Sequence, residues 1–175
     1  MSALHPEPEV RSAAIVFTDL VGFTAYTDVH GDRAAVDVLD RQSRIVEAEL
    51  GARGRLVKEL GDGLMLWFES GTAGVEAVCD ILAGVTAARD TDDFPLAVRM
   101  GMHLGVVVER GDDFVGQTVN IAARVADLAG PGELLVTEHV VRSLDTERYA
   151  GAFRQVGPAR VNGVAAPIWI HRLAM

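Results

Sequence analysis

The sequence predicts an α+β protein with a ferredoxin-like βαββαβ core, a mixed or antiparallel sheet and C-terminal β extensions. Strand and helix patterns interleave along the chain, which favours helices packed against one sheet. Two apolar runs joined by Gly61-Asp62-Gly63 predict an antiparallel hairpin, because Asp-Gly supplies the positive φ of a tight turn. The hydrophobic content of 49% and the 18 glycines fit a compact domain with many turns.

Length and composition indicate one domain over residues 11–175, preceded by a flexible lead-in at residues 1–10. No continuous apolar run approaches the ~18 residues of a membrane span, and the N-terminal residues do not resemble a signal peptide. Cys79 is the only cysteine and is expected in the core, so no intrachain disulfide can form. We therefore expect a cytoplasmic domain without membrane contact, and the net charge of −9 argues against a nucleic-acid partner.

The first expected strand covers residues 13–18 and ends at Asp19. Residues 20–22 should turn the chain, and Phe23-Thr24 begin a helical pattern. A carboxylate at the end of a central strand suits a divalent cation, and the free amides of the first helical turn suit the phosphates that such a cation carries. The alternative is that Asp19 only caps the helix.

The next elements follow in order. Residues 31–51 show apolar residues at helical spacing, bounded by glycines. The hairpin strands are expected over 56–60 and 64–68, and an amphipathic helix is expected around Val75 to Val85.

The C-terminal half continues with strands and one further long helix. Residues 96–104 alternate between apolar and other residues and predict a half-buried strand that an extended segment continues. After a loop at 111–113, a helix is expected from Gly116 to about Leu128. The remaining strands are expected just after Gly132, around 152–156 and around 168–172.

Asp19 and Asp62 both lie at expected strand ends. In a ferredoxin-like core the first strand is central, and a neighbouring hairpin can place its tip beside the end of that strand. Two close carboxylates raise each other's pKa unless a cation lies between them. A pair of Mg²⁺ or Mn²⁺ ions would fill that role, whereas the simpler interpretation of Asp62 is a turn residue.

Three further regions carry polar residues that a fold alone does not require. Lys58 lies just before the hairpin tip, and Asp113 lies in the expected loop, where a solvated lysine and a turn residue are the simpler interpretations. Asn120 and Arg124 are four residues apart on one helix and share a face. A mid-helix asparagine has poor helix propensity, which favours a functional role.

The segments FTDLVGFT, KELGDG and DFVGQTVNIAAR, in this order and spacing, resemble the catalytic domain of class III nucleotidyl cyclases, the adenylate and guanylate cyclases. The resemblance runs from about Arg11 to the C-terminus. It implies the class III cyclase fold and an enzyme of the bacterial homodimeric type. The implied activity is that of an adenylate cyclase, which converts ATP to 3′,5′-cyclic AMP and pyrophosphate.

The resemblance also implies a role for each matching residue. Asp19 and Asp62 match the positions that hold two divalent cations, Mg²⁺ or Mn²⁺, with help from the carbonyl group of Leu20. The segment that cradles the β- and γ-phosphates matches the amides of Gly22, Phe23 and Thr24.

Two more pairs match positions that bind the nucleoside. Lys58 and Asp113 match the pair that reads the purine, and Asn120 and Arg124 match the pair that steadies the ribose and the transition-state charge. A Lys–Asp pair complements the N1 acceptor and N6 donor of adenine, whereas guanine presents the reverse. Since an unpaired buried polar group costs about 1–3 kcal/mol, two mismatches would favour ATP roughly ten- to ten-thousand-fold.

In the family, the metal-binding aspartates come from one subunit and the purine and transition-state residues from the other. The resemblance therefore implies a head-to-tail homodimer with two shared sites, a common symmetry on general grounds. Asn162 stands where many members have a phosphate-contacting lysine, so Arg160 is the nearest cation expected to contact substrate. His103 matches a strand motif of the family and is interpreted as structural.

Three alternatives to an adenylate cyclase follow from the same residues. A guanylate or relaxed-specificity cyclase is disfavoured by Lys58 and Asp113. A catalytically silent, nucleotide-binding regulatory domain is disfavoured because both aspartates and the Asn/Arg pair are present. A diguanylate cyclase would carry a Gly-Gly-Asp/Glu-Glu-Phe hairpin, which this sequence lacks.

Overall fold

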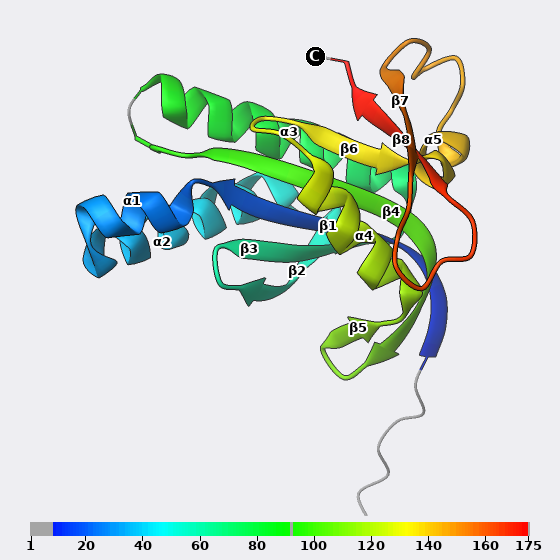
Figure 1. The fold of residues 1–175 in the computed structure, drawn as a ribbon, viewed down its shortest axis with the longest axis horizontal. Coiled ribbons are helices and arrows are strands. Elements are labelled where there is room, and N and C mark those ends of the chain that lie inside the picture. Colours follow the sequence, from blue (N-terminus) through cyan, green and yellow to red (C-terminus); the bar gives the residue numbers. More distant parts are fainter. Residues whose placement is uncertain (1–8, 92, 175) are drawn as a thin grey trace, which may run out of the picture.

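The computed structural model describes residues 9–91 and 93–174, which form one eight-stranded sheet flanked by helices (Figure 1). The strands are β1 (Glu9–Val21), β2 (Gly54–Leu60), β3 (Gly63–Phe68), β4 (Ala97–Arg110), β5 (Asp113–Val115), β6 (Leu134–Thr137), β7 (Phe153–Ala159) and β8 (Ile168–Leu173). The helices are α1 (Phe23–His30), α2 (Asp32–Leu50), α3 (Gly71–Asp90), α4 (Gln117–Leu128) and α5 (Glu138–Ser143).

The order of strands in the sheet is β2-β3-β1-β4-β6-β8-β7, and β5 pairs with β4 outside this path. The first four strands pair antiparallel in the order expected of a βαββαβ core, with β1 at the centre. The parallel pairing of β4 with β6 makes the sheet mixed, and β7 and β8 form the C-terminal extension. The predicted fold class is therefore confirmed.

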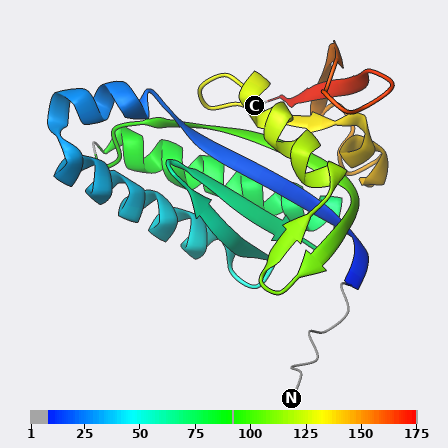
Figure 2. The same cartoon turned by 60° about the horizontal axis from the view of Figure 1, so that its bottom comes forward.

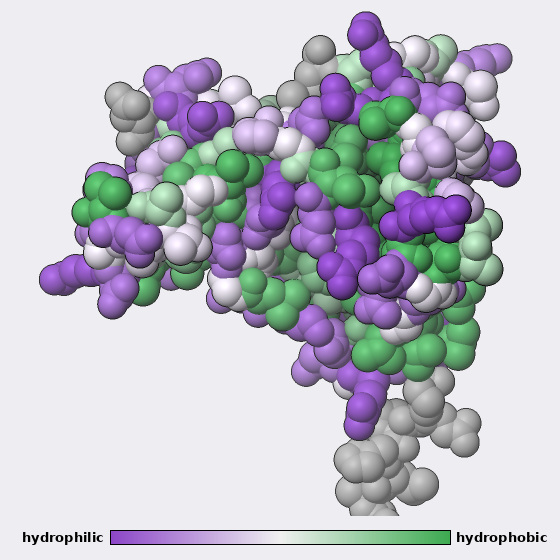
Figure 3. Space-filling model, viewed as in Figure 1, coloured by the Kyte–Doolittle hydropathy of each residue, from purple (hydrophilic) through white to green (hydrophobic). Residues whose placement is uncertain are grey.

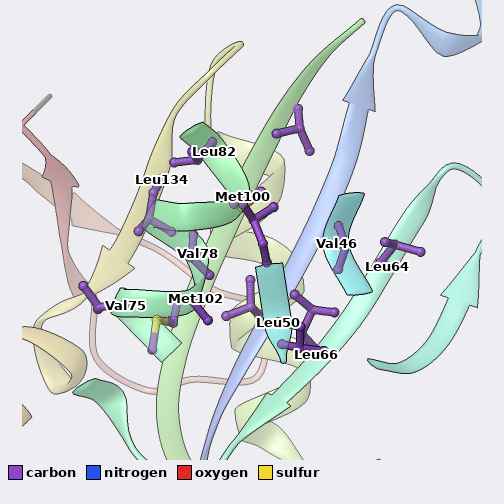
Figure 4. Packing of buried hydrophobic residues seen from close by; sticks show 14 of the residues in the cluster. Val46, Leu50, Leu64, Leu66, Val75, Val78, Leu82, Met100, Met102 and Leu134 are labelled. Carbon is purple, nitrogen blue, oxygen red and sulfur yellow. The ribbon is translucent and has the colours of Figure 1, made fainter. Parts of the chain in front are cut away.

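Alternation along β1 divides the core between the two faces of the sheet. Ala14 and Val16 point to the face covered by α2 and α3, whereas Ala13 and Ile15 point to the face that α4 crosses. Figures 1 and 2 show this three-layer arrangement. The larger cluster fills the space between α2, α3 and the sheet (Figure 4); it includes Val46, Leu50, Leu64, Leu66, Val75, Val78, Leu82, Met100, Met102 and Leu134.

Helix α3 is long and apolar enough, by length and composition, to cross a membrane. Val75, Val78, Ile81 and Val85 on this helix are nevertheless buried in the main core. Its composition is thus explained by packing on the sheet, as in the central helix of a globular domain.

Three segments differ from the sequence prediction. Glu9 and Val10 belong to β1 rather than to the lead-in, because the long strand β4 offers them partners at Glu109 and Val108; residues 1–8 lie outside the described part of the chain. Leu20 and Val21 also continue β1 instead of turning the chain, for the same reason. Asp113 begins β5 rather than lying in a loop, since a tight turn at residues 111–112 folds it back onto β4.

The contact of α4 with the sheet depends on Gly101. A Cβ at this position would lie 2.0 Å from the backbone nitrogen of Ala126 and 2.4 Å from its Cα. We expect Gly101→Ala to displace α4 and to lower the free energy of unfolding by about 3 kcal/mol, as measured by urea denaturation. Gly84→Ala is the matched control, because its Cβ would come no closer than 3.2 Å to the side chains of Glu49 and Ile45, and its nearest neighbours would be these side chains rather than backbone atoms of another element. A similar loss in both variants would contradict this explanation.

Candidate active site

A pocket of about 480 Å³ lies at the carboxyl end of β1, where the chain enters α1. It contains every residue for which the sequence predicts a metal or phosphate contact apart from Arg160. The lining residues are Asp19, Leu20, Val21, Gly22, Phe23, Thr24, Ala25, Asp62 and Arg99.

The turn into α1 leaves backbone N–H groups available at the pocket. Gly22 adopts φ +80°, a conformation that L side chains rarely adopt, and thereby turns the end of β1 into the first turn of α1. No side chain caps this helix N-terminus. The uncapped amides and the helix dipole favour an anion at this position.

The tip of the β2–β3 hairpin is held beside the end of β1. The Leu64 N–H donates to Thr18 Oγ1 at 3.2 Å, and the Gln42 amide donates to the same oxygen at 3.4 Å. Thr18 is 2% exposed, so these bonds lie inside the core. They place Asp62 next to Asp19, as the sequence predicts.

The two carboxylates are electrostatically coupled. Partial burial, followed by the charge of Asp19, raises the pKa of Asp62 above its usual value. Arg99 supplies the nearest positive charge: its Nε and Nη2 lie 2.7 and 2.6 Å from Asp19 Oδ2. Its Nη1 also donates to the carbonyl of Asp127 at the end of α4, at 3.2 Å.

This donor set fits hard divalent cations. Mg²⁺ and Mn²⁺ prefer carboxylate, carbonyl and phosphate oxygens, and Mg²⁺ typically binds one or two carboxylates plus substrate phosphates. Asp19 and Asp62 provide two such carboxylates whose mutual repulsion a cation would relieve. No group of three or more His, Cys, Asp or Glu side chains suited to a metal occurs among residues 9–91 and 93–174, so phosphate and water oxygens would have to complete the coordination.

Arg99 is the charged lining residue of this pocket that sequence reasoning missed. It stands directly opposite Asp19 in the antiparallel pairing of β1 with β4. The available signal was a single charged residue within the otherwise uncharged alternation of residues 96–104. Without the strand register, however, that charge could not be assigned to Asp19.

A second group of polar residues lies between β2 and β5. Lys58 Nζ donates to both carboxylate oxygens of Asp113, at 2.8 and 2.6 Å. Partial burial opposes ionisation of Asp113, but hydrogen bonds from Lys58 and from the Phe114 N–H outweigh it and lower the pKa of this carboxyl. The structure therefore brings the two predicted purine-reading residues together.

The other predicted residues are accessible and lie outside the pocket that holds Asp19. Asn120 and Arg124 are both exposed on α4, and Arg124 pairs only loosely with Asp127 at 3.3 Å. Arg160 and Asn162 are exposed in the connection between β7 and β8. A single chain thus presents the predicted residues as separate groups rather than as one closed site.

His103 has a structural environment, as expected. Its Nδ1 lies 2.8 Å from Thr137 Oγ1, and its ring meets that of His139 edge-on with centroids 5.0 Å apart. The side chain is 4% exposed. Burial, followed by the charge of His139, lowers the pKa of His103 from 6.5 to about 4.

This shift predicts how stability depends on pH. Because the folded pKa is depressed, the unfolded chain takes up the proton first, and stability falls as the pH drops from 6.5 towards 4. The full loss from this residue is roughly 3 kcal/mol. We expect His103→Gln to remove this slope between pH 7 and 4.5 in urea denaturation, whereas the exposed His30→Gln should retain it. Identical slopes in all three proteins would contradict the assignment.

Residues 6–173 match the family model described as "Adenylate and Guanylate cyclase catalytic domain". The chain is 28% identical over 98% of its length to a pH-sensitive adenylate cyclase of Mycobacterium tuberculosis, of which it covers 43%. It is 33% identical over 77% of its length to an adenylate cyclase of Streptomyces coelicolor, of which it covers 36%. The chain therefore spans less than half the length of these relatives.

Solved structures share the same fold. The crystal structure described as an adenylate/guanylate cyclase/hydrolase from Silicibacter pomeroyi superposes with a TM-score of 0.78 and 25% sequence identity. The match covers 97% of this chain and 99% of that one.

Proposed function

The chain belongs to the family of adenylate and guanylate cyclase catalytic domains, and we propose that it is an adenylate cyclase that converts ATP to 3′,5′-cyclic AMP and pyrophosphate. The observation that supports the choice of ATP is the contact between Lys58 and Asp113 at 2.6 Å. A lysine donor beside a carboxylate acceptor complements the N1 and N6 edge of adenine.

Adenine can bind to this pair without separating it fully. Asp113 has two carboxylate oxygens, so one can accept from adenine N6 while the other stays with Lys58. The ammonium group has three protons and can donate to N1 at the same time. Guanine would direct its O6 carbonyl at Asp113 and its N1–H at Lys58, leaving buried polar groups mismatched, which disfavours it.

Asp19, Asp62 and the Leu20 carbonyl would hold two divalent cations, as the family generally uses, and bound cations would neutralise the triphosphate and lower the pKa of the ribose 3′ hydroxyl. The uncapped amides of Gly22, Phe23 and Thr24 would bind the β- and γ-phosphates. A metal ion bound to Asp19 would take the place of Arg99 in the ion pair with this carboxylate. The Arg99 guanidinium would then be free to turn towards the triphosphate.

The proposed reaction is an intramolecular displacement. A bond forms between the 3′ oxygen and the α-phosphorus, the bond from that phosphorus to the bridging oxygen of pyrophosphate breaks, and the hydroxyl proton leaves to Asp19 or to water. Asn120 would orient the ribose, and Arg124 would stabilise the charge that develops on the α-phosphate. One well-placed donor of this kind contributes about 3 kcal/mol.

These residues act together only if a second chain is present. Asn120 and Arg124 are exposed and do not line the pocket of Asp19, so we propose a head-to-tail homodimer with two shared sites. Exposed apolar side chains include Leu60 at the end of β2 and Leu128 at the end of α4, and Figure 3 shows apolar patches on the face that α4 crosses. Arg160 of one subunit would contact the terminal phosphates of the ATP that is bound beside Asp19 of the other subunit.

A product assay tests this proposal. Purified protein is incubated with ATP or GTP and Mg²⁺ or Mn²⁺, and cyclic nucleotides are separated by chromatography at a protein concentration where the dimer is demonstrated. Cyclic AMP from ATP supports the proposal, and cyclic GMP from GTP as the main product would instead support a guanylate or relaxed-specificity cyclase. No product from either nucleotide would favour a silent regulatory domain.

A further inference from the structure

A cluster of one arginine, one carboxylate and two aromatic rings lies between the β2–β3 hairpin and β5. The guanidinium carbon of Arg55 lies 4.8 Å from the ring centroid of Phe114 and 5.7 Å from that of Trp67. The two rings stack, with centroids 5.7 Å apart and planes 7° from parallel. Arg55 Nη2 also donates to Glu109 Oε1 at 3.1 Å. From β2, Arg55 therefore contacts residues of β3, β4 and β5.

A β-bulge places Arg55 and Lys58 on the same face of the sheet. Arg55 pairs with Trp67, and Lys58 pairs with Met65, so one extra residue of β2 lies between them relative to β3. Trp67 and Met65 are two residues apart and share a face. In a regular strand, residues three apart would point to opposite faces. The bulge therefore places the side chains of Arg55 and Lys58 on the same face, where both reach β5.

Side chains alone hold β5 against β2. Within the described residues, the backbone of β5 pairs only with β4, and the β4–β5 turn lies beside the β2–β3 hairpin (Figures 1 and 2). Phe114 is 1% exposed, and its N–H donates to Asp113 Oδ1 at 2.8 Å. The contacts that fix the Phe114 ring therefore also fix the carboxylate of Asp113.

We propose that Arg55 is a positioning residue for purine selectivity, which rests on the proposed function above. It holds Phe114 by stacking and Glu109 by an ion pair, and thereby keeps the Asp113 carboxylate at Lys58 in the orientation that accepts from adenine. A planar guanidinium can stack and form an ion pair simultaneously, which an ammonium group does poorly. Arg55 itself does not need to touch the nucleotide.

The test measures binding without turnover. The analogues 3′-deoxy-ATP and 3′-deoxy-GTP lack the attacking hydroxyl, so their dissociation constants report binding without turnover, and the ratio of the two constants reports purine recognition. We expect Arg55→Met to weaken 3′-deoxy-ATP binding about five- to tenfold and to change 3′-deoxy-GTP binding less than about twofold. Arg55→Lys should give an intermediate ratio, and it carries the comparison if the methionine variant does not fold.

Arg11 provides a matched control. Its guanidinium carbon lies 5.6 Å from the ring centroid of Trp67, and it pairs with the same Glu109 at 3.5 Å. No contact between Arg11 and Phe114 is found among the described residues. Arg11→Met should therefore leave the ratio of the two dissociation constants unchanged, although it removes the same charge from the same surface.

Each outcome decides for or against the role of Arg55. Equal weakening of both analogues, an unchanged ratio, or the same loss in Arg11→Met would overturn it, as would a wild-type protein that binds neither analogue. If the wild-type protein selects 3′-deoxy-ATP but forms no cyclic nucleotide from ATP, the proposed catalytic function fails. The ratio measured for Arg55→Met then still decides the role of Arg55.

Discussion

Replacing Asp62 with asparagine is expected to lower the rate of cyclic AMP formation about a thousandfold or more. Asp62 provides one of only two carboxylates in the pocket, and an amide cannot balance the charge of divalent cations. The rate is measured by chromatography of the product from ATP with Mn²⁺ or Mg²⁺, at saturating cation.

The same substitution should not destabilise the fold. The folded pKa of Asp62 is raised, so its ionised form is disfavoured in the native state, and removing the charge should leave the thermal midpoint unchanged or higher. Asp28→Asn removes the same charge from an exposed position of α1 outside the pocket and should retain full activity. An active Asp62→Asn enzyme, or an inactive Asp28→Asn enzyme, would contradict the assignment of this carboxylate.

Local signals were sufficient to predict which residues meet in the pocket at the end of β1. Asp19, Gly22 and the start of α1 lie within one short segment, so their geometry follows from the last residues of β1 and the turn at Gly22. Predicting that Asp62 lies beside Asp19 required one additional step, which was to place the tip of a hairpin next to the end of the central strand. That step could be made because the order of elements already defined the core topology.

Long-range register could not be predicted in the same way. Arg99 lies beside Asp19 only because of one particular antiparallel alignment of β1 with β4, and a slip by one residue would direct it to the other face. The contact of Arg55 with Phe114 depends on a bulge in β2 and on β5, a strand of three residues that the sequence analysis did not predict. Such features arise from tertiary pairing rather than from local propensity.

Mixing two inactive variants should restore activity. Asp19→Ala removes a carboxylate from the pocket at the carboxyl end of β1, and Lys58→Ala removes the donor that pairs with Asp113. If each active site combines these groups from different subunits, neither homodimer contains an intact site. A heterodimer, however, retains one intact site and one site that carries both substitutions.

The expected recovery follows from counting sites. Random exchange at equal concentrations makes half of the dimers heterodimers, and half of their sites are intact, so activity should reach about a quarter of wild type. Exchange is verified by co-purification of differently tagged subunits. Asp19→Ala mixed with Asp62→Ala is the matched control, because both changes affect the same pocket and every site would stay defective. Absence of recovery despite proven exchange, or recovery in the control mixture, would mean that the groups are not shared between subunits in this way.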